Sequence, residues 1–218
     1  MRLDKAAVVA RIREVGAVAI LRTQTSDQAL RAAEAVIAGG FRIVEVTYGV
    51  PDTANVIAQL VRENSSDLLV GAGTVLTRDQ SYAAIDAGAQ FLVSPCVIPE
   101  MIEAGRERDI ATIPGAFTPT EIYTAWSLGA DIIKLFPAVS NGPEYLRTLR
   151  GPLPHIPIMP TSGVNISNVA DWFRAGAVAV GAVSSVIDPA LIQTGDWDAL
   201  TERSREFLDA VQRARESR

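Results

Sequence analysis

Short runs of β-branched and other apolar residues alternate along the chain with longer, alanine-rich segments whose apolar residues recur at helical spacing. The short runs predict strands at residues 17–22, 43–47, 68–74, 91–95, 111–114, 132–136, 156–160 and 177–182. The longer segments predict helices at residues 27–38, 53–63, 78–87, 100–108, 120–128, 143–150, 167–175 and 197–215, after a leading helix near residues 4–14. Strand and helix therefore alternate through eight units.

Several predicted helices end in glycine, at Gly39 and Gly40, Gly88, Gly129 and Gly176, which is typical of a left-handed C-terminal cap. The units recur at intervals of about 25 residues, as a compact βα repeat requires. Such alternation predicts a parallel sheet covered by helices, and eight units predict closure into a (β/α)8 TIM barrel with an extra N-terminal helix. An open, doubly wound α/β sheet is the alternative, but the chain lacks its glycine-rich first turn followed by an acidic ribose ligand. No linker interrupts the pattern, so we expect residues 1–218 to form one domain.

Composition narrows the possible partners. The 218 residues are 48% hydrophobic and 21% charged, as in an ordinary globular chain. The net charge of -5 and the pI near 5.0 argue against nucleic acid or an anionic membrane, so we expect a small-molecule ligand. Residues 1–16 lack a signal-peptide core, and no run reaches the roughly 18 to 20 apolar residues that a bilayer span needs, which predicts a cytoplasmic protein.

Single cysteine and histidine residues limit the available chemistry. With Cys96 alone, the chain has no internal disulfide and no cysteine-rich metal site. Cys96 lies near a strand end, where it could touch the site, but we expect it to be a small buried filler. With His155 alone, in a proline-flanked loop, neither a histidine-based triad at a strand end nor a multi-histidine metal site fits. Catalysis would have to use carboxylates, lysine, hydroxyls or backbone groups.

Lys134 lies inside the apolar run 131–137, where a charged amine is costly to bury. Burial disfavours the charged form of an amine, so a lysine within a strand can act as a neutral nucleophile. Formation of an imine with a carbonyl substrate is the natural chemistry of such a group. Alternatively, the stem of Lys134 packs on the core while its ammonium group reaches water.

Alternation along residues 43–47 indicates a partner for this lysine. If Val44 and Val46 face the helices, Glu45 faces the interior of the barrel. The same reasoning turns Lys134 inward, so a carboxylate and an amine share one interior. The pair is either catalytic or a structural ion pair in which Glu45 neutralises the lysine.

Other strand ends are also polar, and barrel enzymes gather their reactive groups at the C-terminal ends of strands. The third run ends in Gly71 and Gly73, which either allow a ligand to approach the backbone or simply allow close packing. The loops after the seventh and eighth strands either bind phosphate through backbone N–H groups or are tight turns with capping hydroxyls.

Six motifs together resemble the 2-keto-3-deoxy-6-phosphogluconate (KDPG) / 4-hydroxy-2-oxoglutarate (KHG) aldolase family. They occur in the family's order and span nearly the whole chain, at residues 44–47, 70–76, 93–95, 113–115, 133–138 and 160–164. The resemblance implies a class I aldolase of the (β/α)8 fold, usually a homotrimer, without metal or organic cofactor, of the Entner-Doudoroff type of carbohydrate metabolism. It implies that Lys134 forms the Schiff base and that Glu45 is the general acid and base. It also places Thr74, Pro95 and Phe136 around the pyruvate moiety.

The chain departs from the family at two places. Many members carry an arginine shortly after the Glu-Val-Thr motif to hold the substrate carboxylate, whereas this chain reads Tyr-Gly-Val-Pro at residues 48–51. Arg22, at the end of the first strand, is our candidate replacement, because its planar fork can hold a carboxylate; otherwise it is a solvated rim residue.

The second departure is in the phosphate loops. The family's paired glycines after strand seven become Ser162 and Gly163, following Thr161, and its Gly-Ser after strand eight becomes Val183 and Ser184. The backbone N–H groups of these loops remain available as donors, but the added side chains leave less space for a phosphate group to reach them. A phosphorylated substrate and an unphosphorylated or shorter 2-keto acid both remain open.

These observations predict an aldolase that cleaves a 2-keto-3-deoxy sugar acid to pyruvate and an aldehyde. Lys134 would attack the C2 ketone, while Glu45, through a water, would shuttle protons as the imine forms and the C3–C4 bond breaks. The alternatives are a sugar-phosphate isomerase or decarboxylase that uses both groups without an imine, and a non-catalytic ligand-binding barrel.

Overall fold

The computed structural model describes residues 3–64, 67–138 and 142–216. Within them the strands are β1 (Ala17–Leu21), β2 (Ile43–Thr47), β3 (Leu69–Gly73), β4 (Phe91–Val93), β5 (Ala111–Ile113), β6 (Gly115–Ala116), β7 (Ile133–Leu135), β8 (Ile158–Pro160) and β9 (Val180–Ala182). Every pairing between them is parallel. The fold is therefore α/β with a parallel sheet.

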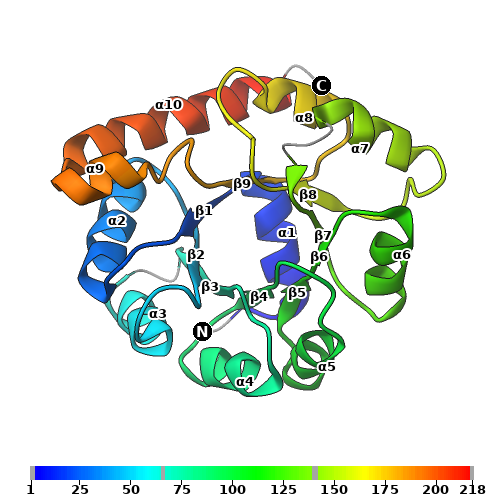
Figure 1. The fold of residues 1–218 in the computed structure, drawn as a ribbon, viewed down its shortest axis with the longest axis horizontal. Helices are drawn as coiled ribbons and strands as arrows, with labels where there is room; N and C mark the ends of the chain where they lie inside the picture. Colours follow the sequence, from blue (N-terminus) through cyan, green and yellow to red (C-terminus); the bar gives the residue numbers. More distant parts are fainter. Residues whose placement is uncertain (1–2, 65–66, 139–141, 217–218) are drawn as a thin grey trace.

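The sheet curls on itself (Figure 1). Its strands pair in the orders β5-β4-β3-β2-β1-β9 and β6-β7-β8. The chain runs from β5 into β6 across Pro114, and Thr161 bridges Gly181 beside β8 and β9. The two groups of strands thus meet at both ends.

The helices lie around the curled sheet except for α1 (Lys5–Val15), which is seen in the middle of the ring (Figure 1). The others are α2 (Ser26–Ala38), α3 (Thr53–Glu63), α4 (Arg78–Asp86), α5 (Pro99–Arg108), α6 (Pro119–Ser127), α7 (Gly142–Arg150), α8 (Val169–Arg174), α9 (Pro189–Thr194) and α10 (Trp197–Glu216). None of the helices in the described part of the chain is long and apolar enough to span a bilayer.

Two apolar layers follow from the alternation of side chains along each strand. Val44 and Val46 belong to an outer layer that packs under the helices, whereas Ile43 belongs to an inner layer enclosed by the strands. Val8 and Ile12 of α1 also pack on the inner layer, and α1 leads through Gly16 into the start of β1. Helix α1 therefore closes the amino-terminal end of the sheet and leaves the carboxyl ends of the strands for a site.

The predicted glycine stops are confirmed. Gly40, Gly88, Gly129 and Gly176 follow helices and have φ between 95° and 107°, a left-handed conformation that glycine adopts without penalty. At the first of these stops it is the second glycine of the pair, not Gly39, that takes the positive φ.

Several elements are shorter than predicted, and three differences have a clear physical reason. The predicted strand 111–114 ends at Ile113 as β5, and a further short strand that was not predicted, β6, follows at Gly115–Ala116, because Pro114 between them has no N–H to donate to a neighbour. Helix α8 begins at Val169 rather than at residue 167, because the side chain of Asn165 accepts from the N–H of Ser167 and ties that segment into a turn. Helix α9 is not predicted; it is only 6 residues long, too short for a helical period, although Asp188 caps its start.

Candidate active site

Lys134 lies at the centre of β7 and points into the ring of strands. Its neighbours Ile133 and Leu135 belong to the outer apolar layer, as predicted from alternation. Across the sheet Lys134 is in register with Gly115 of β6 and Met159 of β8. Only 6% of the residue is exposed. The amine is therefore enclosed rather than extended into solvent.

Glu45, on β2, is fully buried and faces the same interior. Its Oε1 lies 3.9 Å from Nζ of Lys134, which is electrostatic contact but longer than a direct hydrogen bond. Among the described residues neither carboxylate oxygen of Glu45 has a hydrogen-bond partner. A buried structural ion pair is normally closed by additional hydrogen bonds, so this open pair has the character of a reactive site.

Burial raises the pKa of Glu45 above its ordinary value, and the positive charges of Lys134 and Arg22 oppose this only in part. The cause is desolvation, because removal from water disfavours the charged form of a carboxyl group. A carboxyl group with a raised pKa keeps its proton at a pH closer to neutral, where it can act both as a general acid and as a general base.

Gly73 makes room for this carboxylate. A Cβ atom at Gly73 would lie 1.9 Å from Oε1 of Glu45, a distance that no packing allows. Gly71, in contrast, faces the ring of Phe91, which a Cβ there would meet at 2.3 Å. The packing interpretation therefore holds for Gly71, whereas Gly73 shapes the site itself.

Phe136 forms one wall beside the amine. It directly follows β7, and its ring centroid lies 5.2 Å from Nζ of Lys134. An aromatic face at this distance attracts the ammonium form of lysine and excludes water from the neutral form. The side chain is half-buried and so borders the open end of the site.

The other predicted residues all follow the carboxyl ends of strands. Arg22 directly follows β1, is exposed and is near enough to Glu45 for its charge to act on that carboxylate. The remaining ones, after β3, β4, β8 and β9, are Thr74, Pro95, Thr161, Ser162, Gly163 and Ser184. These residues share one edge of the sheet, as the barrel argument predicts.

The loop after β8 has a constrained backbone. Ser162 and Gly163 have φ of 73° and 87°, and the left-handed region is unfavourable for serine. Thr161, just before them, is buried, and its Oγ1 has no hydrogen-bond partner among the described residues. A Cβ atom at Gly181, on the opposite strand, would lie 2.4 Å from that oxygen, so this position requires glycine. Sequence analysis does not predict this requirement, because it depends on the register of two distant segments.

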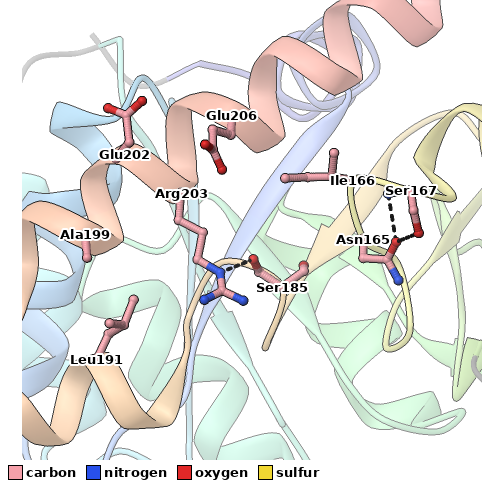
Figure 2. Close-up of a pocket in the computed structure, with 9 residues that line it drawn as sticks. All are labelled: Asn165, Ile166, Ser167, Ser185, Leu191, Ala199, Glu202, Arg203 and Glu206. Atoms are coloured by element: carbon pink, nitrogen blue, oxygen red, sulfur yellow. Dashed lines mark hydrogen bonds between the residues drawn. The ribbon is translucent and has the colours of Figure 1, made fainter.

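A surface pocket of about 580 Å³ lies between α10 and the segments that follow β8 and β9 (Figure 2). From α10, Arg203 reaches across it and donates to the backbone oxygen of Ser185 at 2.9 Å and to the carboxylate of Asp188 at 2.8 Å. These bonds fasten the segment that carries Ser184. Fifteen to eighteen residues separate the partners along the chain, and no sequence signal predicts this support.

Cys96 is exposed, so the expectation of a small buried filler is wrong. It follows Pro95 past the end of β4, where the chain turns over the rim of the sheet and the side chain has no core to fill. Across the described ranges, no group of three or more histidine, cysteine, aspartate or glutamate residues is arranged to hold a metal ion.

Comparison with known proteins gives a consistent family. The family described as "KDPG and KHG aldolase" matches residues 8–203. The 2-dehydro-3-deoxy-phosphogluconate aldolase of Haemophilus influenzae is 30% identical over 94% of this chain and 96% of its own. The 2-dehydro-3-deoxy-6-phosphogalactonate aldolase of Escherichia coli is 36% identical over 78% of this chain and 83% of its own.

A solved structure agrees with these relatives. The KDPG aldolase of Legionella pneumophila, with pyruvate captured as a covalent carbinolamine intermediate, superposes with a TM-score of 0.83 at 29% identity, covering 91% of this chain and 97% of that one. The chain therefore belongs to the KDPG and KHG aldolase family.

Proposed function

We propose that this protein is a class I aldolase that reversibly cleaves a 2-keto-3-deoxy sugar acid to pyruvate and an aldehyde. The substrate is of the 6-phosphogluconate type or a close analogue such as 4-hydroxy-2-oxoglutarate. One observation carries the proposal: the buried amine of Lys134 lies 3.9 Å from a buried carboxylate that has no hydrogen-bond partner among the described residues. Such a pair can form an imine and move the protons that imine chemistry requires.

The choice of lysine supports this role. Of the 20 basic residues only Lys5 and Lys134 are lysines, so 18 are arginines. Arginine remains charged and cannot act as a nucleophile under ordinary conditions. The chain thus uses arginine for nearly all of its cations but keeps a lysine at the one enclosed position that faces Glu45.

The reaction follows from the two groups. The unprotonated amine of Lys134 attacks the C2 ketone, Glu45 gives a proton to the departing oxygen, and loss of water leaves a protonated imine. Glu45 then accepts the C4 hydroxyl proton while the C3–C4 bond breaks and its electrons pass into the imine, which releases the aldehyde and leaves an enamine. Glu45 returns the proton to C3, and hydrolysis frees pyruvate and the amine.

The remaining residues bind the substrate. Arg22 holds the carboxylate through its guanidinium fork. The action of its positive charge on the carboxyl group of Glu45 supports this role. The pyruvate moiety is surrounded by Thr74, Pro95 and Phe136. The distal end of the substrate meets the loops that carry Thr161, Ser162, Gly163 and Ser184, whose backbone is oriented by the left-handed turn.

We further propose a closed (β/α)8 barrel with α1 as an extra N-terminal helix, formed by residues 1–218 as a single domain. Continuity of β5 with β6 and the bridge between Thr161 and Gly181 support closure. A homotrimer in the cytoplasm fits the resemblance to the family. Light scattering on the purified protein tests the trimer.

Pyruvate release from a panel of 2-keto-3-deoxy acids, each with and without a terminal phosphate, tests the proposed function. We expect release from at least one of them, and the better member of each pair identifies the distal group. Failure to release pyruvate from any of them would favour an imine-free isomerase or decarboxylase, or a non-catalytic binding protein.

A further inference from the structure

Tyr48 makes two contacts that span the segment following β3. Its backbone N–H donates to the carbonyl of Gly73 at 2.8 Å, and its hydroxyl donates to the backbone carbonyl of Gln80 at 2.7 Å. Gly73 is the last residue of β3 and Gln80 lies in the first turn of α4. One residue on the loop after β2 therefore holds both ends of the neighbouring loop.

Thr74 lies between these two anchors in an unfavourable conformation. Its φ is 56°, in the left-handed region, which is unfavourable for a residue with a Cβ. Such a conformation persists only where the surrounding structure determines it. Thr74 directly follows Gly73, whose Cα borders the carboxylate of Glu45, so the strained residue adjoins the reactive pair.

Two further hydrogen bonds, donated by backbone N–H groups of the segment itself, hold it in place. The N–H of Val75 donates to the carbonyl of Val93 at 3.0 Å, and the N–H of Leu76 donates to the side-chain oxygen of Gln80 at 2.7 Å. Gln80 thus receives the Tyr48 hydroxyl on its backbone and holds Leu76 with its side chain. The hydroxyl is the side-chain contact that connects Gln80 to the loop after β2, beside the backbone bond from Tyr48 to Gly73.

The environment keeps this hydroxyl a donor. The ring of Tyr48 is half-buried against the outer apolar layer, and burial raises the pKa of Tyr48 above its ordinary value. The phenol therefore stays protonated throughout the neutral range, and the bond to Gln80 does not depend on pH there.

We propose that Tyr48 is a positioning residue whose hydroxyl sets the place of Thr74 and, through Thr74, the affinity of the site for the keto-acid portion of the substrate. This inference rests on the proposed function, in which Thr74 borders pyruvate. Tyr48 does not touch the reacting atoms, so its removal changes binding more than the chemical step.

Tyr48→Phe tests the proposal, because it keeps the ring and removes only the hydroxyl. We expect the KM for the keto acid to rise about three- to tenfold while kcat stays within about twofold, the effect of losing one hydrogen bond. Gln80→Leu, which removes the bond to Leu76, should raise KM in the same way. Tyr82→Phe is the matched control on the same helix, since the hydroxyl of Tyr82 bonds to Glu107 on the outer surface; it should leave KM unchanged.

A double-mutant cycle separates positioning from general support. In a Thr74→Gly background, where glycine tolerates the left-handed backbone and the side chain is absent, Tyr48→Phe should cause no further rise in KM. If the two effects on KM multiply, or if Tyr48→Phe lowers only the melting temperature, Tyr48 does not act through Thr74.

Borohydride trapping with increasing pyruvate distinguishes failure of this inference from failure of the proposed function. In Tyr48→Phe we expect full trapping at saturating pyruvate, with a half-saturating concentration about three- to tenfold higher than in the wild-type chain. Equal half-saturating concentrations overturn the role of Tyr48 alone. No trapping in the wild-type chain overturns the proposed function, and the role of Tyr48 with it.

Discussion

The backbone of Gly73 borders the carboxylate of Glu45 so closely that a Cβ at position 73 would lie 1.9 Å from Oε1. The two residues lie on neighbouring strands, β2 and β3, where Glu45 is in register with Gly71 and Thr47 with Gly73. The position of the carboxylate thus depends on the absence of a side chain two residues further along the adjacent strand.

Gly73→Ala should therefore displace the carboxylate of Glu45. We expect kcat to fall at least about a hundredfold, and the free energy of unfolding to fall by about 1–3 kcal/mol from overpacking. Gly71→Ala is the matched control, because its Cβ would meet the ring of Phe91 instead. It should lose similar stability in a urea titration but keep most of its kcat at low temperature. Wild-type kcat in Gly73→Ala would contradict this view of the pair.

Glu45→Gln should remove proton transfer while preserving the shape of the side chain. We expect kcat for pyruvate release to fall by about 10²–10⁴-fold, the usual contribution of a general acid and base. The circular dichroism spectrum should not change, because an amide fits the same buried space. A loss of less than about tenfold would mean that another group moves the protons.

Stability should depend on pH through Glu45. Its pKa in the folded state is raised above the ordinary value of 4.5, so the folded protein holds this proton more tightly than the unfolded chain does. The stabilisation by the protonated form is complete below the unfolded pKa and is lost as pH rises through the folded pKa.

Glu45→Gln does not ionise, so its melting temperature should rise relative to that of the wild-type chain as pH increases above the ordinary value of 4.5. Thermal unfolding of both proteins across this range measures the difference, and titrating groups that do not interact with Glu45 cancel because the two proteins share them. A difference that stays constant or shrinks with pH would show that the pKa of Glu45 is not raised.

Arg22→Gln should weaken binding of the substrate carboxylate. We expect KM to rise about ten- to a hundredfold, because hydrogen bonds between charged groups are the strong ones, with a smaller effect on kcat. Arg22→Lys keeps the charge but loses the planar fork, so its KM should lie between those of the wild-type chain and Arg22→Gln. Arg31→Gln is the control, since Arg31 pairs with Glu34 on the surface of α2. Equal KM values in Arg22→Gln and the wild-type chain would show that Arg22 is a solvated rim residue that does not bind the substrate carboxylate.

Periodicity was sufficient to predict the alternation of strands and helices and the inward direction of Glu45 and Lys134. Alternation along residues 43–47 predicted that Glu45 faces inward, because only one face of that run can meet the helices. The same argument predicted that Lys134 faces inward. Helix α3, at Thr53–Glu63, begins and ends at the predicted residues because its apolar spacing is regular throughout.

Features that depend on contacts between distant segments could not be predicted in this way. The bond from Arg203 to Asp188 and the anchoring of the loop after β3 by Tyr48 arise only when the strands are in register. Helix α9 is too short to show a period, and the exposure of Cys96 follows from the path of a loop. For α9 the only local signal is the start at Asp188 and Pro189, and the other features have none.

Reductive trapping of pyruvate tests the central claim most directly, since the chain has only two lysines, Lys5 and Lys134. Lys5 pairs with Asp131 at 3.3 Å and serves as an internal control. After incubation with pyruvate and borohydride, peptide mass spectrometry should find one reduced pyruvyl group, on Lys134, and none in Lys134→Ala. No adduct on the wild-type chain, or an adduct that persists in Lys134→Ala, would contradict the assignment.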